Sequence, residues 1–302
     1  MTEPLRVAGV TRRRFLQGLA AGSLALASGC GPERNTLNFY NWANYIGEDT
    51  IPDFQRKTGI QVNYENFSSQ DELFAKLKIG VTGYDLVVAT DYMVRRLLKH
   101  RLLMPLRGLS LEGLSSRFRE TPWDPEHRYS VPYLWGTTGL AYNRSRVRPA
   151  PTSYDSLWDP RYAKRIAMLD EKRDTIGCAL LRLGYSGNSI DPRELEEALK
   201  TLLEQKKLVK TYSSDMIDDL ARGEFHLALG WSGDVGQARD SNDEVDYLIP
   251  REGGFMFVDC LCVPDGAPHP EAAIRFIHYV TQPRVMADIT NLVGYPNAIE
   301  AS

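Results

Sequence analysis

Residues 85–89 read Asp-Leu-Val-Val-Ala, a short run that is apolar after its first residue and is typical of a strand buried inside a sheet. Two more strands are predicted before it, at residues 37–41 and 60–64. Helical patterns separate these segments and follow the last one, at residues 50–58, 69–78 and 92–100. Strands and helices that alternate in this way indicate an α/β fold.

The same alternation returns in the second half of the chain. Strands are predicted at residues 165–169 and 226–231, and helices at 173–183 and 192–204. Between the halves, residues 129–143 hold two short extended runs that are broken by Gly136-Thr137-Thr138-Gly139. Residues 255–263 are predicted to return as a strand, and a helix follows at 270–281. We therefore expect an N-terminal lobe of residues 30–140 and 256–302 and a C-terminal lobe of 141–255, with a hinge at the two crossings.

The first 29 residues have the pattern of an export signal. Residues 11–17 read Thr-Arg-Arg-Arg-Phe-Leu-Gln, which resembles a twin-arginine signal, and an apolar stretch runs from Phe15 to Ala27. This stretch is shorter than the roughly 20 residues that a membrane-spanning helix needs. We expect cleavage before Cys30 and lipidation of its thiol, which would anchor the protein to a membrane on its periplasmic or extracellular face. The alternative is an N-terminal anchor with an incidental cysteine.

The charge balance argues against a nucleic-acid partner. The chain of 302 residues has 36 Lys and Arg against 39 Asp and Glu. Removal of residues 1–29 takes away four arginines and Glu3, which leaves 32 basic and 38 acidic residues and a net charge of −6. An acidic protein attracts cations over about one Debye length, ~8 Å at physiological salt.

Cofactor and metal chemistry find little support in the sequence. Cys260 and Cys262 lie two apart in a predicted strand and cannot easily bond to each other, so these two and Cys178 are predicted to be small buried residues. The histidines lack metal-ligand spacing, and the sequence has no Gly-x-Ser-x-Gly, phosphate-binding loop or dinucleotide-binding fingerprint. An exported enzyme is therefore disfavoured, and no cofactor is expected.

Aromatic and acidic residues gather where the predicted strands end. Ligands of open α/β sheets bind beyond the carboxyl ends of the strands, so these positions define a candidate site. Three pairs lie three residues apart, which places both members on one side of an opening helical turn, and a fourth pair shares one face of a strand. The pairs are Trp42 with Tyr45, Glu171 with Asp174, Trp231 with Asp234, and Phe257 with Asp259, and Thr90 and Tyr92 follow the strand at 85–89.

This combination suits a flexible organic cation such as an alkyl polyamine. An ammonium group over an aromatic ring gains roughly 0.5–2 kcal/mol, depending on how far it is desolvated. A buried ammonium group also needs a carboxylate partner to offset its lost hydration, whereas its methylene groups need flat apolar walls. We therefore expect carboxylates at the ends of the ligand and aromatic rings along its middle.

Structural roles compete with this interpretation for several residues. Asp174 and Asp234 fall where acids commonly cap a helix or complement its dipole. Trp42 and Trp231 would pack in a partly buried position in many folds. Asp259 is different, because a carboxylate between apolar neighbours is costly unless it is paired. This residue is therefore the strongest candidate for a binding role.

Several segments together resemble the periplasmic spermidine/putrescine-binding proteins. The resemblance covers residues 36–298, in order and without large gaps. It implies a two-lobed type-II periplasmic-binding-protein fold that closes on a polyamine and delivers it to the ATP-driven permease of an ABC transporter, and we expect a monomer. The segments are residues 38–46 (NFYNWANYI), 84–90 (YDLVVAT), 132–139 (PYLWGTTG), 230–234 (GWSGD), 252–254 (EGG) through Asp259, and 294–296 (GYP).

The resemblance also implies a role for each candidate residue. Carried over by position, the aromatic walls are Trp42, Tyr45, Tyr92, Trp231 and Phe257. The ammonium partners are Glu171, Asp174, Asp234 and Asp259, with Thr90 as a hydroxyl contact. Tyr295 matches a residue that closes the site in some members of the family.

The chain departs from the family in ways that bear on ligand choice. Phe257 and Asp234 resemble the putrescine-type members, whereas the pair Glu171 and Asp174 resembles the spermidine type. Family members also continue for several tens of residues past the Gly-Tyr-Pro segment, and this chain stops at Ser302. The ligand is therefore predicted as putrescine, spermidine or both. The alternatives are a receptor for another small organic cation and a ligand sensor.

Overall fold

The computed structural model of the chain describes residues 35–80, 83–109 and 111–300. The predicted export signal and Cys30 lie outside these residues, so cleavage and lipidation stay predictions. Residues from Thr36 onward form one compact unit, and the description that follows concerns this unit. Within the described part of the chain, no helix has the length and apolar character needed to cross a membrane.

The strands of the described residues form one mixed sheet of nine strands. Its order is β2-β1-β3-β9-β4-β7-β5-β6, and β8 is added beside β4. Strands β1, β2 and β3 are parallel to one another, as are β5, β6 and β7, whereas β4 and β9 run antiparallel to their neighbours. The bounds are β1 Thr36–Trp42, β2 Gln61–Phe67, β3 Leu86–Thr90, β4 Ser130–Asn143, β5 Ile166–Met168, β6 Val209–Tyr212, β7 Leu227–Trp231, β8 Val245–Leu248 and β9 Phe255–Cys262.

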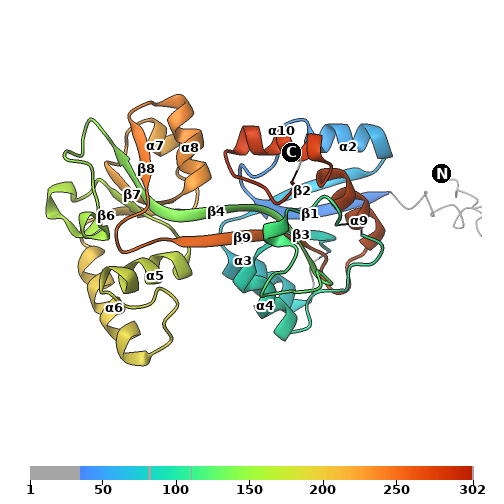
Figure 1. The fold of residues 1–302 in the computed structure, drawn as a ribbon, viewed down its shortest axis with the longest axis horizontal. Helices are drawn as coiled ribbons and strands as arrows, with labels where there is room; N and C mark the ends of the chain where they lie inside the picture. The colour runs from blue at the N-terminus through green and yellow to red at the C-terminus, as the bar shows by residue number, and fades with distance from the viewer. Residues whose placement is uncertain (1–34, 81–82, 110, 301–302) are drawn as a thin grey trace, which may run out of the picture. The chain divides into compact units, whose positions relative to one another are not determined.

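Helices cover both faces of the sheet in each half of the molecule (Figure 1). Their ends follow local rules: the Ser69 side chain accepts a hydrogen bond from the Glu72 backbone amide and caps α3, and Gly59, which has φ +72°, caps the C-terminal end of α2. The bounds are α2 Thr50–Thr58, α3 Gln70–Ile79, α4 Asp91–Lys99, α5 Lys172–Arg182, α6 Pro192–Gln205, α7 Ile217–Ala221, α8 Ser232–Ser241, α9 Pro270–Val280 and α10 Pro283–Val293, with 3-10 turns at Ser116–Phe118, Tyr154–Trp158 and Pro160–Tyr162.

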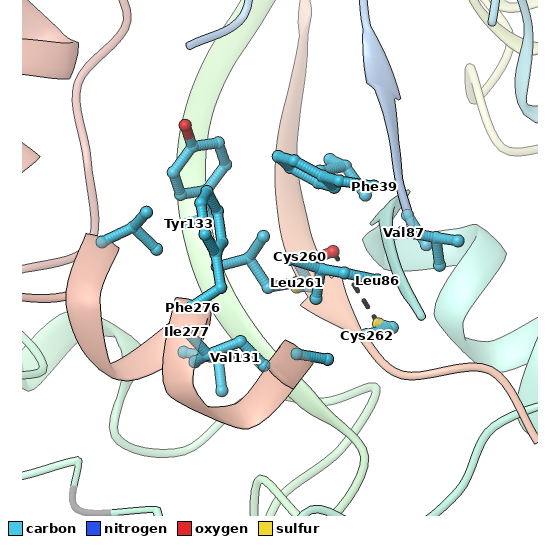
Figure 2. Packing of buried hydrophobic residues seen from close by; sticks show 14 of the residues in the cluster. Phe39, Leu86, Val87, Val131, Tyr133, Cys260, Leu261, Cys262, Phe276 and Ile277 are labelled. Atoms are coloured by element: carbon cyan, nitrogen blue, oxygen red, sulfur yellow. Dashed lines mark hydrogen bonds between the residues drawn. The ribbon is translucent and has the colours of Figure 1, made fainter. Parts of the chain in front are cut away.

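Two large hydrophobic cores lie along this sheet. The first core contains residues from 37 to 134 and from 258 to 299, and the second contains residues from 140 to 245. Figure 2 shows part of the first core, where Phe39, Tyr133 and Phe276 pack around Leu261. We call the two parts the first lobe and the second lobe. The predicted boundaries at 140/141 and 255/256 stay predictions, although the change from one core to the other occurs near both.

The cysteines have the predicted environment. Cys178, Cys260 and Cys262 are free and buried. Cys262 donates a weak hydrogen bond from its Sγ to the backbone oxygen of Cys260, and both side chains lie in the first core (Figure 2). Their thiols are therefore packing groups, and burial raises the pKa of each well above its usual range.

The prediction of two short extended runs at residues 129–143 is wrong. All of these residues except Tyr129 form the single strand β4, which pairs with β9 in the first lobe and with β7 and β8 in the second. A Cβ atom at Gly136 would lie 2.8 Å from Cζ of Phe257, and one at Gly139 would lie 2.5 Å from the Leu248 oxygen. The two glycines therefore permit close approach of neighbouring groups instead of making a turn. Strands β4 and β9 run side by side between the two halves (Figure 1).

Candidate functional site

All eleven residues predicted to contact a ligand line one cavity of about 810 Å³. Trp42 ends β1, Thr90 ends β3 and Trp231 ends β7, so the cavity lies beyond the carboxyl ends of parallel strands, as expected. Its walls come from both lobes. The cavity is much larger than a single water site, and it has the size of a small-molecule pocket.

Asp259 is the most deeply buried acid of the cavity, with an exposed fraction of 3%. It lies opposite Thr90 in the pairing of β9 with β3. The Thr90 hydroxyl donates to Oδ1 of Asp259 at 2.6 Å, and the Tyr45 hydroxyl donates to Oδ2 at 2.9 Å. On the same strand, Val258 and Cys260 point into the first core, while Phe257 shares the cavity face with Asp259. The predicted alternation of this strand is confirmed.

Asp234 and Tyr295 form a hydrogen-bonded pair between the lobes. Asp234 lies in the first turn of α8, and Tyr295 follows α10 and is buried in the first core. The Tyr295 hydroxyl donates to Oδ1 of Asp234 at 2.7 Å and accepts from the Asp234 amide at 3.2 Å. The side chain of Asp234 therefore does not cap its own helix, because it is held by a tyrosine from the other lobe.

Asp174 lies in the first turn of α5, where a helix-capping role was the competing interpretation. The cap of this helix is Glu171, and Asp174 instead accepts a hydrogen bond from the Thr138 hydroxyl of β4 at 2.6 Å. We call Asp174, Asp234 and Asp259 the cavity carboxylates. Each accepts a hydrogen bond from a neutral hydroxyl group, and none is in a salt bridge with a described residue.

Glu171 is directed across the cavity toward the first lobe. Its Oε1 accepts a hydrogen bond from the Tyr92 hydroxyl at 3.0 Å. Its Oε2 accepts one at 3.3 Å from the backbone amide of Gln70, at the start of α3. Outside the cavity, Lys172 forms an ion pair with Asp71 at 2.8 Å. These contacts join α5 to α3 and α4, so the described structure is closed at this edge.

Aromatic rings form a continuous wall between these acids. Trp42 and Trp231, from opposite lobes, have ring centroids 5.4 Å apart. Trp231 in turn lies 6.3 Å from Phe257, and Phe257 lies 6.2 Å from Tyr295. Among the described residues, the indole Nε1 of Trp42 is buried without a hydrogen-bond acceptor. The wall therefore offers flat apolar faces to the cavity.

The enclosure of the cavity carboxylates changes their acidity. Desolvation raises the pKa of Asp174 to about 6, against the downward effect of its hydrogen bond from Thr138. Desolvation also raises the pKa of Asp234 and of Asp259 to about 7, opposed in each case by tyrosine or threonine donors. These groups titrate near neutral pH, and a cation placed beside them would favour their ionised forms.

The placement of Tyr45 differs from the sequence prediction. Trp42 and Tyr45 were expected on one side of a helical turn, but the helix α2 begins only at Thr50. Asn44 has φ +53°, a left-handed conformation that asparagine tolerates, and it bends the chain directly after β1. Both side chains still line the cavity.

The structure also brings residues to the cavity that the sequence analysis missed. Gln70, with an exposed fraction of 1%, accepts a hydrogen bond from the Thr90 amide through Oε1 and donates from Nε2 to the Val88 oxygen. Arg95 and Arg173 also line the cavity. The arginines follow Tyr92 by three residues and Glu171 by two, so local spacing from predicted site residues was the available signal.

A two-lobed α/β fold with a cavity between the lobes is typical of solute-binding proteins. The chain belongs to the bacterial extracellular solute-binding protein family, whose sequence model matches residues 49–302. It is 35% identical over 286 residues to the spermidine/putrescine-binding periplasmic protein of Escherichia coli K12, covering 92% of this chain and 82% of that protein.

Solved structures agree with this assignment. A protein from Listeria monocytogenes, proposed to be a spermidine/putrescine ABC transporter, superposes with a TM-score of 0.84 at 30% identity, covering 88% of this chain and 84% of that one. The TpPotD lipoprotein of Treponema pallidum superposes with a TM-score of 0.78 at 29% identity, covering 88% of this chain and 86% of that one. These similar proteins share the two-lobed periplasmic binding fold.

Proposed function

We propose that this protein captures a polyamine, putrescine or spermidine, outside the cytoplasm and delivers it to the permease of an ABC transporter. The observation that carries the proposal is the set of three cavity carboxylates, Asp174, Asp234 and Asp259, which contact neutral hydroxyl donors and no salt-bridge partner among the described residues. A buried carboxylate without a cation is unfavourable, and an ammonium group of the ligand would supply the missing charge.

The aromatic wall complements this charge pattern. The rings of Trp42, Trp231 and Phe257 lie between acids of the two lobes and offer flat surfaces for the methylene groups of a polyamine. Ammonium groups near these rings would gain additional cation–π attraction. Eight acidic side chains against two arginines line the cavity, which favours a cationic ligand over an anionic one.

Delivery and anchoring rest on the family and on the N-terminal sequence. The relatives include a periplasmic protein of E. coli and a lipoprotein of T. pallidum. We place this protein on the periplasmic or extracellular face of a membrane, tethered through a lipid on Cys30 and acting as a monomer that binds solute and carries out no catalysis. A tether confines the carrier near its permease and raises its effective concentration there.

Titration calorimetry with putrescine, spermidine and agmatine tests the ligand class. We expect at least one of the three to bind with a dissociation constant well below 1 mM, because two or three desolvated ammonium–carboxylate pairs form at once. The absence of heat with all three at millimolar concentration would eliminate the polyamine proposal and leave another small organic cation. Detection of a chemically altered polyamine after incubation would overturn the assignment as a pure binding protein.

A further inference from the structure

A fixed positive charge lies in the wall of this acidic cavity. Arg173, in the first turn of α5, has its guanidinium carbon 4.6 Å from the centroid of the Tyr92 ring. Its Nη2 donates to Oδ1 of Asn188 at 2.6 Å. The stacking and the hydrogen bond hold the guanidinium at one place on the cavity lining, although the side chain as a whole is exposed to solvent.

The position of Arg173 changes the role expected for Tyr92. The face of the Tyr92 ring that Arg173 covers is closed to a ligand ammonium group, because the guanidinium already occupies the cation–π position. The hydroxyl of Tyr92 is engaged as well, since it donates to Glu171. Tyr92 therefore supports the cavity wall at this end instead of receiving the charge of the ligand.

The charges of the cavity are consequently uneven. Near Tyr92, Arg173 and Arg95 lower the pKa of Asp91 against a larger upward effect of desolvation. Arg173 also lowers the pKa of Asp174, but desolvation and the neighbouring Glu171 raise it more strongly. Asp234 and Asp259 have tyrosine or threonine donors and further acids as neighbours. Protein cations thus act on the acids near Tyr92, whereas the pKa shifts of Asp234 and Asp259 come mainly from desolvation, hydroxyl donors and other acids, with no cation among these main causes.

We propose that Arg173 is a specificity-determining residue that favours ligands with two ammonium groups and disfavours a third ammonium group beside Tyr92. This inference rests on the proposed binding of polyamines. Specificity of this kind comes from a repulsive element directed at the competing ligand, which costs the preferred ligand little. A diamine would place its charges near Asp234 and Asp259, and a triamine would have to bring one charge toward the guanidinium.

The test compares Arg173→Met, which keeps much of the apolar stem, with Arg173→Lys, which keeps the charge. Calorimetry would measure the dissociation constants of putrescine, cadaverine and spermidine for the full chain and both variants. We expect Arg173→Met to improve the affinity for spermidine relative to putrescine by about tenfold. Arg173→Lys should keep the native ratio of spermidine to putrescine affinity within about twofold. Because cadaverine also has two charges, its affinity should change in the same direction as that of putrescine in every variant.

The outcomes separate this inference from the proposed function. A spermidine-to-putrescine ratio that is the same in the native protein and in Arg173→Met overturns the role of Arg173 while leaving polyamine binding intact. A native protein that prefers spermidine by more than tenfold also overturns it. A native protein that binds none of the three amines overturns both proposals. If Arg173→Met does not fold, as judged by circular dichroism, Arg173→Gln replaces it with the same expected ratio.

Discussion

Tyr45 and Tyr295 pack edge to face with ring centroids 5.0 Å apart, and each donates its hydroxyl group to a different cavity carboxylate. Tyr45 binds Asp259 of β9, in the first lobe, whereas Tyr295 binds Asp234 of α8, in the second. The two rings therefore connect an acid of one lobe to an acid of the other. Separation of the lobes would have to break the bond between Tyr295 and Asp234, so this contact belongs to the closed form.

A methyl group at Gly233 should prevent this contact. A Cβ atom there would lie 2.3 Å from Cδ2 of Tyr295, so Gly233→Ala must push the ring away from α8. We expect the affinity for the polyamine to fall at least tenfold, because closure would no longer bring Tyr295 onto Asp234. Calorimetry with the best ligand of the amine panel measures the change.

Gly236 provides a matched control on the same helix. A Cβ atom at Gly236 meets no heavy atom within 4 Å, so Gly236→Ala should leave affinity unchanged and stabilise α8 by roughly 0.5–1 kcal/mol. Thermal unfolding measures the second effect. Equal affinities of the two alanine variants would contradict the closing role of Tyr295.

Asp259 should be the acid whose loss costs most binding. Replacement by alanine or asparagine removes a buried carboxylate that Thr90 and Tyr45 hold in place. We expect the free energy of binding to weaken by at least about 2 kcal/mol, roughly 30-fold in the dissociation constant. Asp243→Asn, at an exposed position, is the control and should bind like the native protein. Native affinity in Asp259→Asn would exclude an ammonium site at this residue.

The two cross-lobe contacts of α5 should differ in strength. Lys172→Ala breaks an ion pair with Asp71 in which the lysine side chain is 77% exposed, and such pairs contribute about 0–1 kcal/mol, so affinity should change less than fivefold. Glu171→Gln removes a buried carboxylate that accepts bonds from Tyr92 and the Gln70 amide, and should weaken binding more than tenfold. A larger effect of Lys172→Ala than of Glu171→Gln would reverse this ranking.

Much of the fold was predictable because hydrophobic periodicity and helix ends are local properties. The strand at residues 85–89 and the helix at 69–78 follow from their own residues, and both occur in the structure within one residue at each end. The continuous strand β4 was missed. Glycine is needed at position 136 because Phe257 and Tyr295, more than a hundred residues away in the sequence, pack closely against it. Short elements such as α7 and β8 were not anticipated, since four or five residues carry too little periodic signal.

The cavity residues were predictable as a set, but their partners were not. The rule that ligands bind beyond the carboxyl ends of strands depends on topology alone, and the acids and rings that it selected line one cavity. The stacking of Arg173 on Tyr92 and the bond between Glu171 and the Gln70 amide join the two lobes. Such contacts depend on how far the lobes close, which no local pattern in the sequence records.

The raised pKa values of the cavity carboxylates predict that binding strengthens as the pH rises. Desolvation raises the pKa of Asp174 to about 6 and of Asp234 and Asp259 to about 7. The folded, ligand-free protein therefore binds these protons more tightly than the unfolded chain does. This contribution to the free energy of unfolding is fully present below the ordinary carboxyl pKa of 3.8 and is lost as the pH rises toward 7.

An organic cation favours the ionised carboxylates, so it must displace their protons below about pH 7. We expect the dissociation constant of the preferred amine to decrease from pH 5 to pH 8, and the ligand-induced increase in Tm to be larger at pH 8. Calorimetry near pH 6.5 in buffers of different ionisation enthalpy should detect protons released on binding. Asp234→Asn should reduce the number of protons released on binding, because one titrating carboxylate is gone. Affinity that is constant from pH 5 to pH 8, with no proton release, would show that the ligand does not bind at these carboxylates.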